Sequence, residues 1–317
     1  MKTDSQSPHT IKTKPTATTT EGPTQTHASQ TSSLNSIRKT PVPTDTATTA
    51  PIKFYRDAEF LNSPDARPLR IMSEYHGPES VLAKHDITDT IVFFGSARIL
   101  SRRQCEQDLS RAKTGQGTIT VKMAQQRLAL SHYHEECREL AKRLTQWSCG
   151  LQSTGKRFVV CSGGGPGLME AANQGAVEAG GDSLGLGISL PHEQTSNDYI
   201  SKDLSFQFHY FFMRKYWFAY LAKAFIIMPG GFGTLDELLE ILTLRQTGKM
   251  TKKVPILLYG QDFWNRVINF DALVDFGTIS PEDVELFHIA NSVDDAFNYI
   301  TNALIEMGGL DHPGGGM

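Results

Sequence analysis

The sequence predicts an α/β protein with a doubly wound parallel sheet of about seven strands and helices on both faces. The first reason is that, from about residue 86, short continuous apolar runs alternate with stretches of helical periodicity. Continuous apolar strands between helices are typical of a parallel sheet that is covered on both faces. The second reason is that two of these runs lead directly into glycine-rich loops. The predicted strands are residues 90–94, 157–161, 183–188, 204–208, 224–228, 254–259 and 286–290.

Helices are expected between these strands, and two helix starts are unusually clear. Ser280 is followed by a proline and two acidic residues, and Ser292 is followed two residues later by a pair of aspartates. Both patterns match a capping residue followed by first-turn residues that suit the helix dipole. Residues 101–127 are polar and charged, which predicts an inserted helical or loop segment. The predicted helices are residues 130–147, 167–179, 211–222, 234–247, 262–274 and 293–306.

Composition divides the chain into four parts. Of the first 50 residues, 26 are Thr, Ser or Pro and none is aromatic, so this part cannot bury enough apolar surface to offset its chain entropy. It also lacks the apolar segment of a secretory signal, and its acidic residues argue against a transit peptide. We expect a disordered extension at 1–50, a helical lead-in packed on the sheet at 51–85, the α/β domain at 86–307, and a flexible Gly-rich tail at 308–317.

Charge and composition exclude several function classes. The formal net charge of −3 is too small, and of the wrong sign, for a protein held to nucleic acid by phosphate neutralisation. No run reaches the ~18 apolar residues that are needed to span a bilayer. The four cysteines do not form a disulfide framework and none belongs to a C-x-x-C pair. The sequence therefore predicts a cytoplasmic protein without a nucleic-acid or membrane partner.

The segment 228–237, Met-Pro-Gly-Gly-Phe-Gly-Thr-Leu-Asp-Glu, lies between a predicted strand and an amphipathic helix. Its three glycines let the backbone turn tightly and approach a ligand closely. The first N–H groups of the following helix have no partner within the helix and lie at the positive end of its dipole. Thr234 can add a hydroxyl donor. The pattern favours a bound phosphate over the alternative of an ordinary glycine-rich turn.

A second glycine-rich loop, Ser162 to Glu170, also leaves a predicted strand and enters a predicted helix. In a doubly wound sheet both loops lie at the carboxyl ends of strands, where ligands bind. Neither loop matches the G-x-G-x-x-G dinucleotide fingerprint, and neither is followed by the G-K-[ST] of a P-loop. The remaining interpretation is a site for a phosphate monoester, which favours a mononucleotide over NAD or ATP.

Three elements of the sequence together resemble the LOG family. They are Gly163-Gly164-Gly165 with Gly167-Leu168-Met169, then Met213-Arg214-Lys215, and then the PGGxGTxxE motif that begins at Pro229. Members of this family include cytokinin riboside 5′-monophosphate phosphoribohydrolases and were once mislabelled lysine decarboxylases. The resemblance covers roughly residues 86–305. It implies a Rossmann-like fold, a homodimer or larger homo-oligomer, hydrolysis of the N-glycosidic bond of a nucleoside monophosphate, and no metal or organic cofactor.

The resemblance also implies roles for individual residues. The catalytic pair of the family is an arginine and a motif glutamate 23 positions later, a spacing that Arg214 and Glu237 satisfy. Glu193 follows a strand-end proline at the place of a substrate-contacting glutamate, and Ser96 follows the first strand. The residues expected to bind the substrate, chiefly its phosphate, are Gly230, Gly231, Phe232, Gly233, Thr234, Leu235, Asp236, Lys215, Met213, Glu193, Ser96, Gly163, Gly164 and Gly165.

These residue types suit the implied chemistry. Breaking a ribosyl–base bond develops positive charge on the sugar ring, which a nearby carboxylate stabilises while it aligns the attacking water. Glu237 lies in the first turn of its predicted helix, on the side of the phosphate-binding amides. Arg214 can pair with the phosphate or hold the carboxylate in position. Taken singly, an acid at a helix start and an arginine on a helix surface are ordinary features; their joint spacing favours a catalytic pair.

Other interpretations fit the sequence less well. The same pocket can serve a non-hydrolytic nucleotide or molybdenum-cofactor carrier of the same fold, but such a carrier has no need of both Arg214 and Glu237. Amino-acid decarboxylation needs a lysine Schiff base with pyridoxal phosphate, and no lysine here has a suitable context. Four residues of one predicted helix have ligand-type side chains but lack further ligands at suitable spacing, so no metal site is predicted. They are His132, His134, Glu135 and Cys137.

Overall fold

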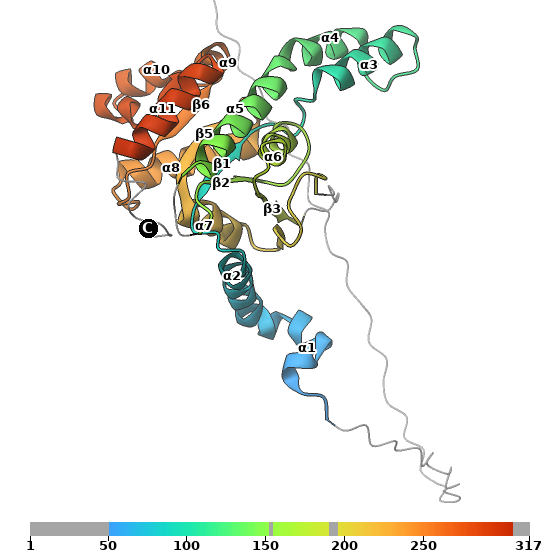
Figure 1. Ribbon diagram of the computed structural model, residues 1–317, viewed down its shortest axis with the longest axis vertical. Helices are drawn as coiled ribbons and strands as arrows, with labels where there is room; N and C mark the ends of the chain where they lie inside the picture. The colour runs from blue at the N-terminus through green and yellow to red at the C-terminus, as the bar shows by residue number, and fades with distance from the viewer. Residues whose placement is uncertain (1–50, 152–154, 190–195, 307–317) are drawn as a thin grey trace, which may run out of the picture. The chain divides into compact units, whose positions relative to one another are not determined.

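The computed structural model describes residues 51–151, 155–189 and 196–306, so the predictions for 1–50 and 308–317 lie outside the described residues. Within these ranges seven strands form one sheet, in which every pairing is parallel. The strands are β1 Thr90–Phe94, β2 Val159–Ser162, β3 Ser183–Ile188, β4 Ser205–Phe208, β5 Ala222–Ile227, β6 Ile256–Tyr259 and β7 His288–Ala290. Their order across the sheet is β4-β3-β2-β1-β5-β6-β7. Figure 1 labels the five inner strands of this order.

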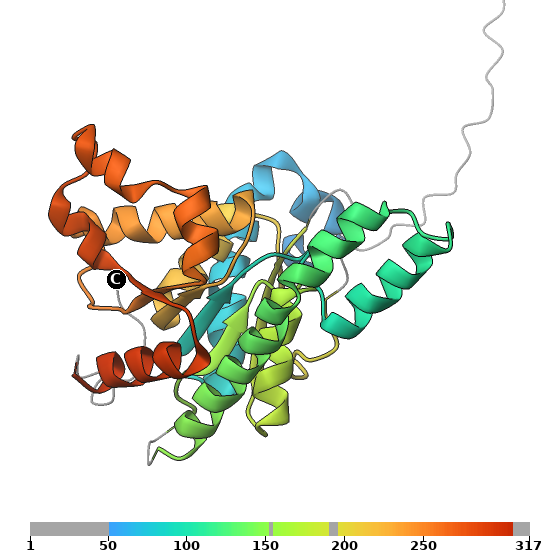
Figure 2. The ribbon, with the colours of Figure 1, turned by 90° about the horizontal axis from the view of Figure 1, so that it is seen from above.

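Helices cover both faces of this sheet. The larger ones are α5 His132–Cys149, α6 Leu168–Glu178, α7 Phe211–Leu221, α8 Phe232–Gln246 and α11 Val293–Glu306, and α9 Gln261–Val267 and α10 Phe270–Asp275 are shorter. Buried residues of α5, α6 and α11 form one core cluster, and buried residues of α7, α8 and α9 belong to another. Figure 2 shows α5 and α11 together on one side of the sheet, with the orange helices on the other. The predicted doubly wound α/β fold is confirmed.

The strand sequences explain why two cores form. Along β1, Ile91 and Phe93 belong to the cluster under α5, whereas Val92 and Phe94 belong to the cluster under α7. All five residues of β1 are buried. Because neighbouring side chains of a strand point to opposite faces, a continuous apolar run is what a sheet covered on both sides requires.

The strand order places a ligand crevice at the middle of the sheet. From β1 the chain builds outward through β2, β3 and β4, and then returns to the other side of β1 with β5. At such a switch point the connections after the two central strands run to opposite faces, which opens a crevice at their carboxyl ends. The two glycine-rich loops, which follow β2 and β5, both lie at this edge.

Some predicted boundaries were wrong for identifiable reasons. The helix predicted at 262–274 is two helices, because Ile268 is extended and the Asn269 side chain caps α10 by accepting a hydrogen bond from the Ala272 amide at 3.0 Å. The strand predicted from residue 286 begins at His288, because a 3-10 helix, η3 Pro281–Leu286, follows the Ser280 cap. The helix start at Ser280 was correctly predicted, whereas the cap at Asn269 was missed.

Two helical segments extend from the sheet domain. The inserted segment at 101–127 is a pair of helices, α3 Arg102–Lys113 and α4 Val121–Leu130, which project together beyond α5 (Figure 1). Before the sheet come α1 Ala58–Asn62 and α2 Arg67–Lys84, with two 3-10 turns, η1 Phe54–Arg56 and η2 Pro64–Ala66. Helix α2 contacts α7, and its Leu82 belongs to the same core cluster as Val92 and Phe94 of β1. None of the helices described has the length and apolar character that crossing a membrane requires.

Candidate active site

A cavity of about 730 Å³ opens at the carboxyl ends of the central strands. Its walls come from the segments after β1, β2, β3 and β5, from β4, and from the first turns of α7 and α8. Most of the predicted site residues gather here, although they come from four separate stretches of the chain. Those that line the cavity are Ser96, Gly163, Gly164, Gly165, Arg214, Gly231, Phe232, Gly233, Thr234, Leu235, Asp236 and Glu237.

Backbone hydrogen bonds join the loops that form the floor of the cavity. The Ser96 amide donates to the Pro229 carbonyl at 3.1 Å, and the Ser96 carbonyl accepts from the Leu168 amide at 3.0 Å. Gly167 has φ +70°, and a Cβ atom added to it would lie 2.5 Å from the Ser96 oxygen. Only glycine allows this close approach. The loop after β1 is therefore held between the two glycine-rich loops.

The loop after β5 presents the N-terminus of α8 to the cavity. Gly231 is the N-cap residue, and Gly230 has no room for a side chain because an added Cβ would lie 2.1 Å from Thr234 Oγ1. By contrast, a Cβ added to Gly231 or Gly233 would have no neighbouring atom within 4 Å. The first amides of a helix lack intrahelical partners and carry its positive dipole end. This turn is therefore shaped to receive an anion.

Arg214 and Glu237 meet inside the cavity. Arg214 Nη1 lies 3.7 Å from Glu237 Oε1, and their side chains are only 15% and 8% exposed. Arg214 Nε donates to the Leu186 carbonyl at 2.7 Å, which fixes the guanidinium at the end of β3. The missing side chain of Gly163 makes room for the arginine, because a Cβ there would lie 2.7 Å from Arg214 Nη2.

Burial sets the charge state of this pair. Burial raises the pKa of Glu237 to about 7, although the charges of Arg214 and Lys215 favour the carboxylate, and Glu240 and Asp236 add smaller raising effects. Burial also lowers the pKa of Arg214, from an ordinary value so high that the group stays charged near neutral pH. A glutamate with its pKa near 7, beside an arginine in a cavity, is the kind of group that functional sites contain.

Three of the described residues that were predicted to bind the substrate do not line the cavity. Lys215 lies on α7 with its Nζ 2.9 Å from Asp236 Oδ2 and 2.6 Å from Glu240 Oε2. Burial alone would lower the pKa of Lys215, but its hydrogen bonds to these two carboxylates raise it. Met213 is buried in the core, and Gly230 packs closely against the Thr234 side chain. Glu193 lies outside the described residues.

A buried polar network supports the loop after β2, and the sequence analysis missed it. Ser162 Oγ donates to Asn173 Oδ1 at 2.7 Å and accepts from the Gly164 amide at 3.0 Å. Asn197 Nδ2 donates to the carbonyls of Gly164 and Gly165 at 3.1 and 3.0 Å, and to Asn173 Oδ1 at 2.9 Å. An asparagine on the apolar face of helix α6 is the one signal that could have found it, because buried amides need partners.

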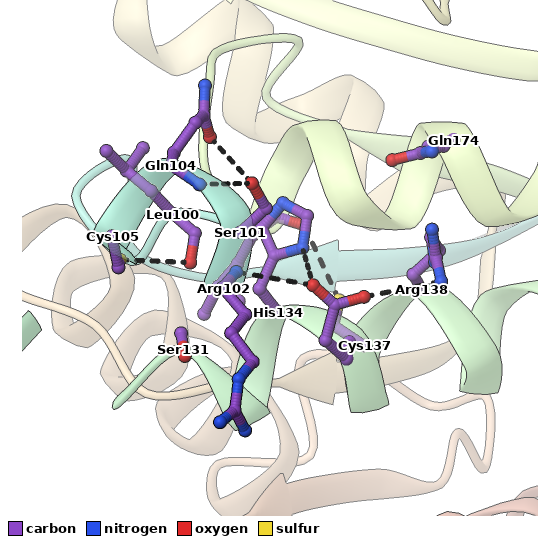
Figure 3. Close-up of polar contacts among 12 residues, drawn as sticks. Leu100, Ser101, Arg102, Gln104, Cys105, Ser131, His134, Cys137, Arg138 and Gln174 are labelled. Atoms are coloured by element: carbon purple, nitrogen blue, oxygen red, sulfur yellow. Dashed lines mark hydrogen bonds and ion pairs between the residues drawn. The ribbon is translucent and has the colours of Figure 1, made fainter. Parts of the chain in front are cut away.

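The four residues with ligand-type side chains lie on α5, where they make structural contacts. Figure 3 shows His134 beside a carboxylate that also reaches Arg138 and the Arg102 amide; it belongs to Glu135, 3.7 Å from His134 Nδ1. The Cys137 thiol is buried and donates to the Leu168 carbonyl at 3.4 Å. Burial raises the pKa of Cys137. Among the residues that the structure describes, no group of three or more His, Cys, Asp or Glu could hold a metal ion.

Comparison with known proteins identifies the family. The family model described as "possible lysine decarboxylase" matches residues 169–300. The probable cytokinin riboside 5′-monophosphate phosphoribohydrolase LOG4 of Oryza sativa subsp. japonica is 30% identical over 165 residues, which cover 50% of this chain and 70% of that relative. The chain belongs to the LOG family. The LOG resemblance that the glycine motifs predicted is therefore confirmed.

For two other LOG proteins, the match covers a smaller share of the relative's own length. The enzyme LOG2 of Arabidopsis thaliana is 33% identical over 150 residues, and LOG7 of the same plant is 37% identical over 126 residues; both bear the name cytokinin riboside 5′-monophosphate phosphoribohydrolase. These matches cover 47% and 39% of this chain, and the chain spans 65% and 56% of the two relatives.

Two solved structures resemble this chain at lower sequence identity. The structural-genomics target TM1055 is 20% identical with a TM-score of 0.41, over 68% of this chain and 99% of that one. The Moco carrier protein from Chlamydomonas reinhardtii is 18% identical with a TM-score of 0.41, over 69% of this chain and 99% of that one. Likeness at this level carries no argument about function.

Proposed function

We propose that this protein hydrolyses the N-glycosidic bond of a nucleoside 5′-monophosphate, AMP or a cytokinin riboside monophosphate, to the free base and ribose 5-phosphate. The observation that carries the proposal is the contact between Arg214 and Glu237, 3.7 Å apart in a cavity that also contains the first turn of α8. The names of the relatives LOG2 and LOG7 support the same activity.

In this proposal the substrate phosphate lies at the N-terminus of α8. Gly231 and Gly233 leave open space beside the backbone, so the anionic group can approach the helix amides directly. Thr234, which lines the cavity, supplies a hydroxyl. Lys215 does not line the cavity; its ammonium lies beside the same turn, where it pairs with Asp236 and Glu240.

The sugar then lies next to Glu237. Positive charge that develops on the ring as the base departs is stabilised by the Glu237 carboxylate, which also aligns the attacking water. Arg214, whose Nη1 lies 3.7 Å from Glu237 Oε1, holds this carboxylate in position. As the family resemblance implies, the proposed reaction uses no metal or organic cofactor.

We also propose that the protein acts as a cytoplasmic homodimer or larger homo-oligomer. Phe232 and Phe211 line the cavity and are 91% and 51% exposed, and the neighbouring Phe212 is 50% exposed. Aromatic side chains gathered on a surface favour a protein–protein interface. The four cysteines are free thiols, as is usual in a reducing compartment.

The test is to incubate the purified protein with a panel of nucleoside monophosphates and to measure free base by chromatography. Glu237→Ala should keep the fold and nucleotide binding but lose base release by about 10³-fold, in the range seen when one key electrostatic group is removed. Glu170→Ala is the matched control: Glu170 also lies in the first turn of a helix after a glycine-rich loop, but it does not line the cavity. Its base release should match that of the unmodified protein.

Two results would contradict the hydrolase proposal. One is equal base release by the Glu237→Ala and Glu170→Ala variants. The other is tight nucleotide binding with no base released from any member of the panel, which would favour the carrier function instead.

A further inference from the structure

Helix α7 is short and carries the proposed catalytic arginine near its N-terminus. It contains 11 residues and runs directly into β5, because Leu221 is the last residue of the helix and Ala222 the first of the strand. Its N-cap residue, Tyr210, makes no side-chain cap hydrogen bond. A helix of this length is marginal by itself, and its first amides and last carbonyls need partners from outside it.

A glutamate from α2 supplies the missing cap. Glu74 accepts hydrogen bonds from the His209 amide at 2.7 Å and from the Tyr210 amide at 3.2 Å, one through each carboxylate oxygen. The carbonyl of Glu74 also accepts from Trp217 Nε1 at 3.0 Å. Glu74 therefore contacts both the start of α7 and its buried middle, from a position 135 residues away in sequence.

A lysine from the segment before β6 holds the other end. Lys252 Nζ donates to the carbonyls of Ala219 and Tyr220 at 2.7 and 2.9 Å, which are among the last carbonyls of α7. The Lys252 carbonyl accepts in turn from Arg245 Nη1 at 2.7 Å, which ties the segment to α8. Burial and the charge of Lys223 lower the pKa of Lys252 to about 7, whereas helix carbonyls favour its protonated form.

The two contacts have the signs that the helix dipole favours. A negative group at the N-terminus and a positive group at the C-terminus each stabilise a helix, and the effect is largest within the first and last turns. Tyr210 lies one turn before Arg214, whose amide donates to the Tyr210 carbonyl at 3.2 Å. Glu74 therefore binds Tyr210, the residue whose carbonyl accepts the hydrogen bond from the Arg214 amide.

We propose that Glu74 and Lys252 clamp the two ends of α7 and thereby act as positioning residues for Arg214. The inference rests on the proposed function, since Arg214 is the catalytic residue only there. It assigns a role to α2, which lies outside the residues 169–300 that the family model matches.

The clamp itself is tested by hydrogen exchange, measured by mass spectrometry on the full chain. Glu74→Ala and Lys252→Met should each speed exchange of peptides covering 211–221 by about tenfold, as expected for loss of a helix cap. Two matched controls should leave this exchange unchanged. Glu79→Ala removes a second glutamate of α2 that pairs with His76 on the exposed side, and Lys249→Met removes an exposed lysine three positions before Lys252.

The consequence for Arg214 is tested by turnover of the nucleotide. Glu74→Ala should lower kcat by about tenfold with little change in KM, because a misplaced catalytic group weakens transition-state stabilisation more than ground-state binding. The acid limb of the pH–rate profile should also move to higher pH, because Arg214 is the strongest influence that favours the Glu237 carboxylate. Partial unfolding would lower kcat without moving this limb. Glu74→Gln, which keeps one acceptor oxygen, should recover part of the rate.

The outcomes separate the two proposals. Equal exchange at 211–221 in Glu74→Ala and Glu79→Ala would overturn the clamp. Faster exchange with unchanged kcat and an unmoved pH limb would overturn the positioning role. If the unmodified protein released no base, the proposed function would fail, and exchange at 211–221 would still decide whether Glu74 and Lys252 hold α7.

Discussion

The two glycine-rich loops look alike in sequence but use their glycines differently. In the loop after β2, Gly163, Gly164 and Gly167 are closely packed, and two of them have positive φ angles. In the loop after β5, Gly231 and Gly233 face open space, and only Gly230 is packed. The first loop thus needs glycine to fit against protein atoms, whereas the second needs it to leave backbone amides accessible. A run of glycines therefore does not by itself distinguish a packed loop from a binding loop.

The substitution expected to have the largest effect, and so to distinguish the packed loop from the open one most clearly, is at Gly167. Alanine there would combine a φ of +70° with a Cβ 2.5 Å from the Ser96 oxygen, so Gly167→Ala should destabilise the fold by about 3 kcal/mol or more. Gly180→Ala is the control: its φ is +77° but nothing lies within 4 Å, so it should cost only about 1 kcal/mol. Urea unfolding measures both values, and equal values would mean that the contact with Ser96 does not matter.

A smaller loss of stability but a clear loss of activity is expected at Gly163. The new Cβ of Gly163→Ala would lie 2.7 Å from both Arg214 Nη2 and Met169 Sδ, which are ends of side chains that can move. The fold should therefore survive, while the displaced guanidinium lowers kcat by about 100-fold. Steady-state kinetics and thermal unfolding together check this prediction. Unchanged kcat in a well-folded variant would show that Gly163 does not position Arg214.

The open loop leads to Glu237, whose pH dependence gives a third test. Because the carboxylate is the active form, base release should rise with pH through about 7. Stability should change in the opposite direction, because between pH 4.5 and about 7 the folded protein holds a proton that the unfolded chain has lost. The free energy of unfolding should therefore fall across that range by about 3 kcal/mol. Glu237→Gln should remove this fall. Parallel pH profiles of the two proteins in urea unfolding would contradict it.

The smallest effect is expected at Gly233. Alanine there meets no atom within 4 Å and lies in the first turn of α8, so Gly233→Ala should leave stability unchanged or raise it by up to about 1 kcal/mol. The added methyl group lies where we place the phosphate, so affinity for AMP should fall by about fivefold. Titration calorimetry with AMP checks this. Unweakened binding would mean that the phosphate lies elsewhere in the cavity.

The sequence was sufficient for those parts of the fold that depend on local patterns. Strands buried on both faces read as continuous apolar runs, and β1 and β3 begin and end where the pattern predicted. The break at Asn269 was missed because a single capping side chain decided it against a continuous helical pattern. Local propensity is a weak guide where one tertiary or capping contact competes with it.

The site was predictable to the extent that it lies on motifs. The Arg214–Glu237 pair and the glycine loops came from spacing and resemblance, and the structure brings them into one cavity. Their roles in catalysis and binding remain predictions. The side-chain contacts of Glu74 and Lys252 with α7 left no mark in the sequence, because each links residues that are at least 32 positions apart. Such pairs become visible only when the fold brings them together.

The junction of α7 with β5 has a consequence for how the domain can vary. The α3–α4 hairpin between β1 and α5 projects beyond α5 (Figure 1), so added residues there need not disturb the sheet. Between Leu221 and Ala222 there is no linker in which added residues could be absorbed. An insertion there would shift the arginine relative to the loop after β5, so we expect that homologues change length freely at the hairpin and keep this junction fixed.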